Sequence, residues 1–129
     1  MDKENKKEHY LNEDGIIKQF PKFEDFYKNV VKQNNAFKTI EEAKKERERR
    51  KLLYEFYQFR DDCNGGWKPD WGKQDAKYFL YYSHKFGIFS VNYIRIQEMF
   101  HTFGYFKNEK DAQRAIDLFN DRIRKLFID

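Results

Sequence analysis

The sequence has almost no cysteine, the residue that forms the disulfide frameworks of small proteins. Cys63 is the only cysteine, so a disulfide framework and a thiolate metal site are both excluded. A lone cysteine is typical of a reducing, intracellular setting. The first ten residues lack the apolar run of a signal peptide, and no stretch approaches the length of a transmembrane helix. We therefore expect a soluble, cytoplasmic protein.

Sets of residues that would carry catalysis are also missing. The histidines have no ligand spacing relative to one another or to Cys63, and the serines lack a neighbouring base. No glycine-rich phosphate-binding loop occurs. Four aspartates could bind a divalent ion, but aspartates at turns and helix ends are usually structural. These candidates are His9, His84, His101, Ser83, Ser90, Asp61, Asp62, Asp70 and Asp75. We expect no metal, no cofactor and no enzymatic activity.

The chain is nevertheless rich in large aromatic side chains. Only 40% of its 129 residues are hydrophobic and 37% are charged, which by itself would lean toward disorder. However, 19% are aromatic, and large rings bury much area each. A few of them can hold a small core, so we expect one folded domain.

The N-terminal part divides into a polar stretch and a helical stretch. Residues 1–15 are charged and close with Asp14–Gly15, which indicates a flexible tail or a poorly anchored first turn. A small apolar cluster, Ile16, Ile17 and Phe20, precedes Pro21. Apolar residues at spacings of three and four then predict an amphipathic helix over Lys22–Gln33. The single domain is expected over 16–129, with a helical part at 16–62.

A long helix is predicted from Thr39 to about Asp62. Glu42, three residues after Thr39, is typical of a capping box, and Gly65–Gly66 is a suitable stop. The second half is aromatic and must be buried. The first half is nearly all charge, and Arg47 and Arg50 interrupt its apolar stripe. A continuous coiled-coil seam is therefore disfavoured.

A basic segment lies in the charged half of this helix. It holds six cations against Glu46 and Glu48, and such a segment attracts polyanions or an acidic protein surface. The alternative is a solvated helix face with i,i+4 pairs. The candidate partner-binding residues are Lys44, Lys45, Arg47, Arg49, Arg50 and Lys51.

An irregular stretch with two indoles follows the long helix. Pro69 removes a backbone donor, and Asp70 can cap local amides. We interpret Trp67 and Trp71 as structural anchors, together with Pro69 and Asp70, where the chain passes from helix to sheet. Ligand stacking by these indoles is the alternative.

Residues 67–129 are expected to form a sheet and a helix. The runs Lys77–Ser83 and Ile88–Ile94 predict an antiparallel hairpin, and a third strand is predicted within Ile96–Phe106, where Gly104 indicates a bulge or close approach. A helical stripe starts after Asn108, with an interruption at Asn120–Asp121. The predicted fold class is α+β: N-terminal helices, a three-stranded antiparallel sheet and a C-terminal helix.

Nucleic-acid binding is one functional hypothesis. Six sheet aromatics could stack bases, and 104–118 is similar to the end of an RNA-recognition motif. However, Phe100 and Thr102 occupy positions where that motif requires glycine or a small residue, and its helix between the first two strands is absent. The aromatics are Tyr78, Phe79, Tyr81, Tyr82, Phe89 and Tyr93.

A closer resemblance is carried by Gly66–Trp71, Lys77–Tyr82 and Tyr105–Ile116. These segments resemble small accessory proteins of phages and prophages of low-GC Gram-positive bacteria, over roughly residues 50–127. Members often carry Gly-Asp after the last helix, where this chain has Asn120–Asp121. The resemblance implies a protein of the host-cell cytoplasm that binds a macromolecule without catalysis, as anti-CRISPR inhibitors of host defence nucleases do.

The leading expectation is thus a non-enzymatic inhibitor that acts by protein–protein contact, with a CRISPR nuclease complex as a candidate partner. The alternative is a nucleic-acid-binding protein that uses the basic helix and the sheet aromatics. A dimer built through the long helix is a third possibility, and the sequence leaves the oligomeric state open.

Overall fold

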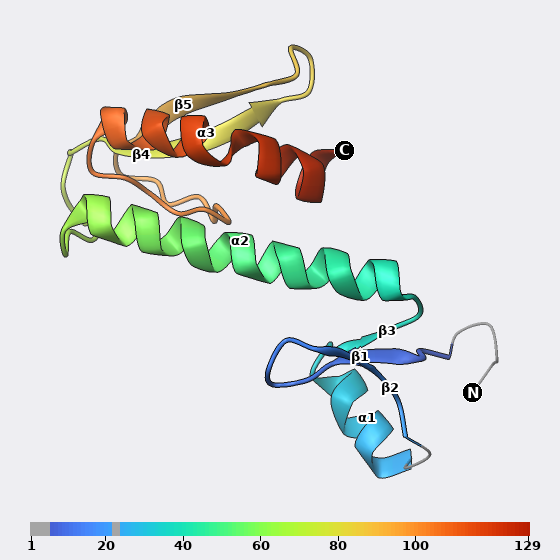
Figure 1. Cartoon of the computed structure of the whole chain (residues 1–129). Helices are drawn as coiled ribbons and strands as arrows, with labels where there is room; N and C mark the ends of the chain where they lie inside the picture. Colours follow the sequence, from blue (N-terminus) through green and yellow to red (C-terminus); the bar gives the residue numbers. More distant parts are fainter. Residues whose placement is uncertain (1–5, 22–23) are drawn as a thin grey trace. The chain divides into compact units, whose positions relative to one another are not determined.

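The computed structural model describes residues 6–21 and 24–129 (Figure 1). The chain forms two compact units, Met1–Lys51 and Leu52–Asp129, where a single domain over 16–129 was expected. The fold is mixed α and β, but its sheets differ from the prediction. A three-stranded sheet lies in the first unit and a two-stranded sheet in the second.

The first unit contains a small antiparallel sheet that the sequence did not predict. Strands β1 (His9–Leu11), β2 (Ile17–Gln19) and β3 (Ala36–Phe37) are arranged in the order β2-β1-β3. The Asn12 side chain accepts hydrogen bonds from the amides of Asp14 and Ile16 and closes the β1–β2 turn. The flexible tail expected over 1–15 is therefore wrong for His9–Leu11, while residues 1–5 lie outside the described residues.

The predicted amphipathic helix is present as α1, Glu24–Lys32. The first two residues of its expected range, Lys22 and Phe23, lie outside the described residues. Aromatic rings cluster in this unit: the ring centroids of Tyr10 and Phe20 lie 4.9 Å apart, and those of Tyr10 and Phe26 lie 5.1 Å apart.

The long helix is confirmed as α2, Ile40–Asn64, which begins in the first unit and ends in the second. Thr39 Oγ1 accepts the amide of Glu42 at 3.1 Å, and Glu42 accepts the amide of Lys38 at 3.3 Å. These bonds satisfy amides at the start of the helix. The predicted stop is also present, because Gly65 and Gly66 both have positive φ.

The second unit contains the predicted hairpin, β4 (Lys77–Ser83) and β5 (Ile88–Ile94), paired from Lys77↔Ile94 to Ser83↔Ile88. The third strand expected within Ile96–Phe106 is wrong. This stretch is an irregular loop whose one ladder contact is the bridge between Tyr78 and Phe106. A strand does not form because the loop turns toward α2, to which it is hydrogen bonded.

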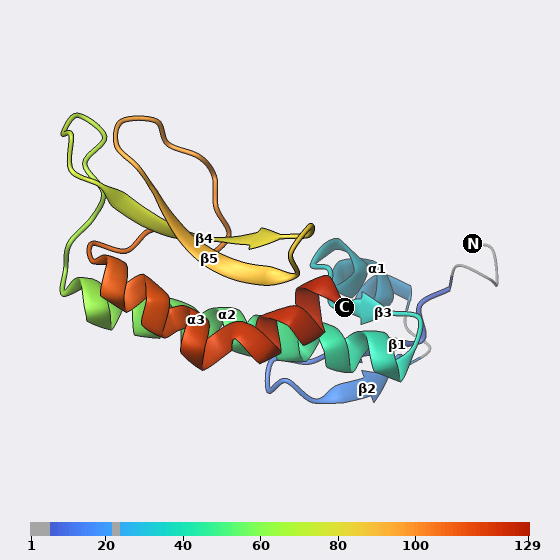
Figure 2. The same cartoon turned by 90° about the horizontal axis from the view of Figure 1, so that it is seen from above.

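Helix α3 (Glu109–Ile123) lies alongside the hairpin in both views (Figures 1 and 2). The interruption expected at Asn120–Asp121 is wrong, because α3 continues to Ile123 and passes into a π-helical turn, η2, Arg124–Ile128. The buried side chains of α3 recur at helical spacing along one face, and the polar pair does not interrupt the helix. The core of this unit comprises Leu52, Phe56, Leu80, Phe106, Ala112, Ala115, Ile116, Phe119, Ile123 and Leu126.

Candidate functional site

A loop of residues 95–105 is attached to the last three turns of α2. Tyr57 donates its hydroxyl to the Thr102 carbonyl at 2.8 Å, and Arg60 Nη1 donates to the Phe103 carbonyl at 3.1 Å. Asn64 donates to the Tyr105 carbonyl at 3.0 Å. Tyr57, Arg60 and Asn64 follow one another at spacings of three and four, which places them on one helix face.

Asn64 makes the most complete of these attachments. Its side chain is buried, and its carbonyl oxygen also accepts the amide of Lys107 at 3.0 Å. The carboxamide thus binds the backbone of Tyr105 and Lys107, while Phe106 between them pairs with Tyr78 of β4. Sequence reasoning placed Asn64 only at the end of a helix. The spacing of three and four residues between Tyr57, Arg60 and Asn64 was the signal available.

The 95–105 loop is held from within by Tyr105. Its hydroxyl accepts the Met99 amide at 2.9 Å and donates to the Met99 carbonyl. Burial raises the pKa of the Tyr105 hydroxyl, the Met99 bond lowers it, and the Glu98 carboxylate raises it. The hydroxyl therefore stays protonated at neutral pH and can hold both backbone groups of Met99.

His101 is stacked on the sheet. Its ring lies 4.1 Å from that of Phe79, nearly parallel, and its Nε2 is buried without a hydrogen-bond partner among the described residues. Burial lowers the pKa of the His101 imidazole, so the neutral form is favoured. The loop therefore covers the outer face of the sheet at Phe79, while Tyr81, farther along the same face, is exposed.

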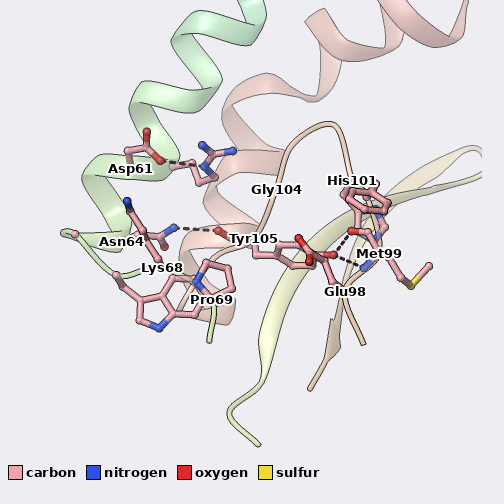
Figure 3. Close-up of a pocket in the computed structure, with 13 residues that line it drawn as sticks. Asp61, Asn64, Lys68, Pro69, Glu98, Met99, His101, Gly104 and Tyr105 are labelled. Atoms are coloured by element: carbon pink, nitrogen blue, oxygen red, sulfur yellow. Dashed lines mark hydrogen bonds and ion pairs between the residues drawn. The ribbon is translucent and has the colours of Figure 1, made fainter. Parts of the chain in front are cut away.

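A cleft of about 600 Å³ opens beside the loop (Figure 3). Its lining combines two cations, two acids and several apolar side chains. No serine, threonine or cysteine is among its described lining residues, which leaves no alcohol or thiol nucleophile there. The lining includes Arg60, Asp61, Trp67, Lys68, Glu98 and Phe100.

The loop also presents apolar side chains to solvent. Phe100 is 98% exposed, and Ile96 and Met99 are each about half exposed. Large apolar side chains gathered on one short segment mark an interaction surface more often than an isolated exposed residue does. Sequence reasoning had assigned this stretch to a strand and so missed the surface.

The structure separates the six cations of the predicted basic segment. Lys44, Lys45 and Lys51 are exposed. Arg50 is also exposed, and it donates to the Asn35 side chain at 2.7 Å and to the Asn34 carbonyl at 3.0 Å, while Arg47 donates to the Gly15 carbonyl at 3.5 Å. These three hydrogen bonds explain why the apolar stripe is interrupted at Arg47 and Arg50: both arginines bind loop groups of the first unit. Arg49 is half-buried and lies 4.0 Å from Glu46.

The four predicted anchor residues lie at the entry to the sheet. The Trp71 ring lies 5.0 Å from Tyr105, and Lys77 Nζ lies 5.2 Å from the Trp71 ring. Asp70 accepts the Gly72 amide at 3.0 Å, as its turn chemistry predicts. Trp67 and Pro69 line the cleft, so the position of Trp67 agrees with both interpretations, a structural anchor and a ligand contact.

The six sheet aromatics are divided between the two faces of the β4–β5 hairpin. Paired residues share a face, so Tyr78, Tyr82, Phe89 and Tyr93 lie on the face that carries Leu80. Phe79 and Tyr81 lie on the other face. The two exposed rings, Tyr81 and Tyr93, are thus on opposite sides of the sheet.

The described residues offer little reactive chemistry. Within 6–21 and 24–129, no three His, Cys, Asp or Glu side chains are grouped as metal ligands. Burial, reinforced by the Asp111 carboxylate, raises the pKa of the Cys63 thiol, which favours the unreactive thiol form. None of the helices described here has the length and apolar character needed to cross a membrane.

Compared with protein-family models, curated proteins and solved structures, the chain shows no match in any of the three.

Proposed function

We propose that this protein acts without catalysis, by binding another protein through the 95–105 loop. The observation that carries the proposal is the exposure of Phe100, 98%, on a loop that is hydrogen bonded to α2. A side chain of this size has apolar area to bury in a partner. Ile96 and Met99 extend the apolar surface on the same loop.

The attachment to α2 favours binding, because a flexible loop would lose conformational entropy on binding a partner and an attached loop loses less. Hydrogen bonds from Tyr57, Arg60 and Asn64 fix the loop before any partner arrives. Aromatic side chains held in this way are typical centres of protein interfaces. Burying a phenylalanine contributes about 1.5–3 kcal/mol, which corresponds to roughly a tenfold to hundredfold change in affinity.

We further propose that the chain is a phage or prophage accessory protein whose partner is a host defence nuclease, in the host-cell cytoplasm. The support is the resemblance of Gly66–Trp71, Lys77–Tyr82 and Tyr105–Ile116 to such proteins. Loop and cleft carry charges of both signs, Arg60 and Lys68 with Asp61 and Glu98. A surface with charges of both signs is better suited to binding another protein than to mimicking the phosphate backbone of DNA.

The test compares two exposed apolar residues of the second unit. Tagged wild-type protein, Phe100→Ala and Leu118→Ala are incubated with a purified CRISPR nuclease complex from a low-GC Gram-positive host. Leu118, 59% exposed on α3, is the matched control. We expect wild type and Leu118→Ala to bind and to reduce DNA cleavage, and Phe100→Ala to bind at least about tenfold more weakly. Equal binding by all three would reject the loop as the interface, and no binding by wild type would reject this partner.

A second candidate function is nucleic-acid binding by the exposed lysines of the basic segment, Lys44, Lys45 and Lys51. Their exposure favours contact with phosphates, and it does not depend on the sheet aromatics. Affinity for DNA or RNA should then fall steeply with salt, and replacing the three lysines by glutamate should abolish binding. Absence of binding at low salt would remove this candidate.

A further inference from the structure

The longest uncharged run of the chain coincides with an edge strand. Residues 86–94 contain no charged side chain, in a chain in which 37% of residues are charged. This run includes all of β5, whose partner among the described strands is β4 alone. Edge strands usually carry lysine, proline or a bulge that prevents further pairing. β5 has none of the three, and Ile88 and Tyr93 at its ends are about half exposed.

The hydrogen-bond pattern shows which backbone groups of β5 point away from β4. Tyr78 exchanges both backbone hydrogen bonds with Phe106, so its backbone groups point away from β5. The pair Tyr78↔Tyr93 is therefore a non-hydrogen-bonded pair, and bonding alternates along an antiparallel ladder. It follows that Phe89, Val91 and Tyr93 direct their backbone groups toward the open edge, while Ser90 and Asn92 bond to β4.

One of these outward amides is already occupied. The Tyr93 amide donates to the side chain of Asn92 at 2.8 Å. Among the described residues, this is the one hydrogen bond found for the three outward amides. Phe89 and Val91 are thus left with a complete donor and acceptor each at the open edge.

We propose that β5 pairs antiparallel with β5 of a second copy of this chain, with Ser90 opposite Ser90 of that copy. In this register Phe89 of each chain lies opposite Val91 of the other, and each such pair exchanges both of its backbone hydrogen bonds. The register uses the two residues whose outward groups are open and leaves the Asn92–Tyr93 bond intact. The hairpins of the two copies then form one continuous sheet.

Three features favour a second copy over a foreign strand. β5 itself has no charged side chain with which to select a charged peptide, whereas its edge is complementary to itself about a two-fold axis. Ser90 at the centre is small enough for a non-hydrogen-bonded pair, in which opposed Cα atoms lie about 4.5 Å apart. A two-stranded sheet is also marginal by itself, and pairing doubles its number of strands.

Opposed charges at Ser90 test the register. We would compare wild type, Ser90→Lys, Ser90→Glu and the control Gln113→Lys, on an exposed position of α3, by analytical ultracentrifugation across micromolar concentrations. Wild type and Gln113→Lys should reach twice the monomer mass of 16.0 kDa. Each Ser90 variant alone should dissociate about tenfold more readily, because like charges then face each other. An equimolar mixture of Ser90→Lys and Ser90→Glu should recover the dimer.

Amide hydrogen exchange tests the proposal on the wild-type chain, without any substitution. At low concentration the Phe89 and Val91 amides should exchange fast and those of Ser90 and Asn92 slowly. At high concentration all four should be protected. A chain that remains monomeric at every concentration, or one whose Ser90 variants fold and dimerise like wild type, would overturn the proposal.

Discussion

Gly104 lies so close to Arg60 that a Cβ atom at residue 104 would come within 2.5 Å of Arg60 Nη1. The backbone of Gly104 also has φ of +68°, which L side chains rarely adopt. The sequence predicted a bulge or a close approach at this glycine, and the close approach is what the structure contains. It allows the guanidinium to reach the Phe103 carbonyl and to hold the 95–105 loop.

Gly104→Ala should therefore destabilise the second unit by about 2–3 kcal/mol, from backbone strain and loss of the Arg60 bond. Gly65→Ala is the matched control, because Gly65 also has positive φ but has open space around its Cβ position. Urea unfolding should show a smaller loss for Gly65→Ala. In an Arg60→Ala background the cost of Gly104→Ala should fall to that of the control, and strictly additive costs would contradict the contact.

Asn64→Ala should cost about 2–3 kcal/mol of unfolding free energy, because it leaves the buried Tyr105 carbonyl and the Lys107 amide without their partner. Asn64→Asp should also destabilise, since a carboxylate retains the acceptor but has no donor for Tyr105. Asn120→Ala is the control, because among the described residues that side chain bonds to its neighbour Asp121 alone. Similar losses for the two alanine variants would show that Asn64 does not act as a backbone partner.

Lys77→Met tests a buried cation. Lys77 is 1% exposed, and its Nζ donates to the carbonyls of Lys73 and Arg95 at 2.8 and 2.5 Å. Methionine keeps the apolar stem but no donor, so we expect a loss of about 1.5–3 kcal/mol in thermal or urea unfolding. Lys73→Met, at an exposed position, should change stability little. A neutral Lys77→Met would mean that water replaces the ammonium at these carbonyls.

His101 should make stability depend on pH. Because burial lowers its pKa in the folded state, the unfolded chain binds more protons below the ordinary value of 6.5. The contribution of neutral His101 is therefore present above pH 6.5, and it is lost as the pH falls from there to the folded pKa. Glu98 and Tyr105 are the nearby titratable groups of the same loop.

The comparison variant is His101→Phe, which keeps an aromatic ring on Phe79 but cannot titrate. Unfolding free energies of both proteins are measured between pH 4 and 8, and their difference isolates the histidine. Wild type should lose stability relative to His101→Phe below pH 6.5. A difference that is constant over this range would contradict the burial of a neutral imidazole.

Elements whose signals are local were predictable from sequence. The β4–β5 hairpin, the amphipathic α1 and the capped start of α2 follow from alternation, helical spacing and the Thr39–Glu42 pair, and the structure confirms them. The β1–β2 hairpin was missed because each of its strands is only three residues long. Its Asp14–Gly15 turn, flanked by apolar residues, was the available sign.

The site was less predictable because it depends on contacts between distant residues. Phe103 and Tyr105 have strand-forming propensity, but hydrogen bonds from α2 hold their backbone as a loop. The sequence predicted that Arg47 and Arg50 are solvated or bind a partner. Their bonds to Gly15, Asn34 and Asn35 cannot be predicted from residue spacing. The basic segment as a partner-binding site stays a prediction.

Photo-crosslinking from position 100 tests the central claim most directly. A benzophenone-bearing residue is introduced at Phe100 in one protein and at Leu118 in another, and each is irradiated with the purified nuclease complex. We predict a covalent adduct with a protein subunit from position 100, and none from position 118. Adducts of equal yield from both positions, or none from position 100 while the complex binds, would contradict a partner site on the 95–105 loop.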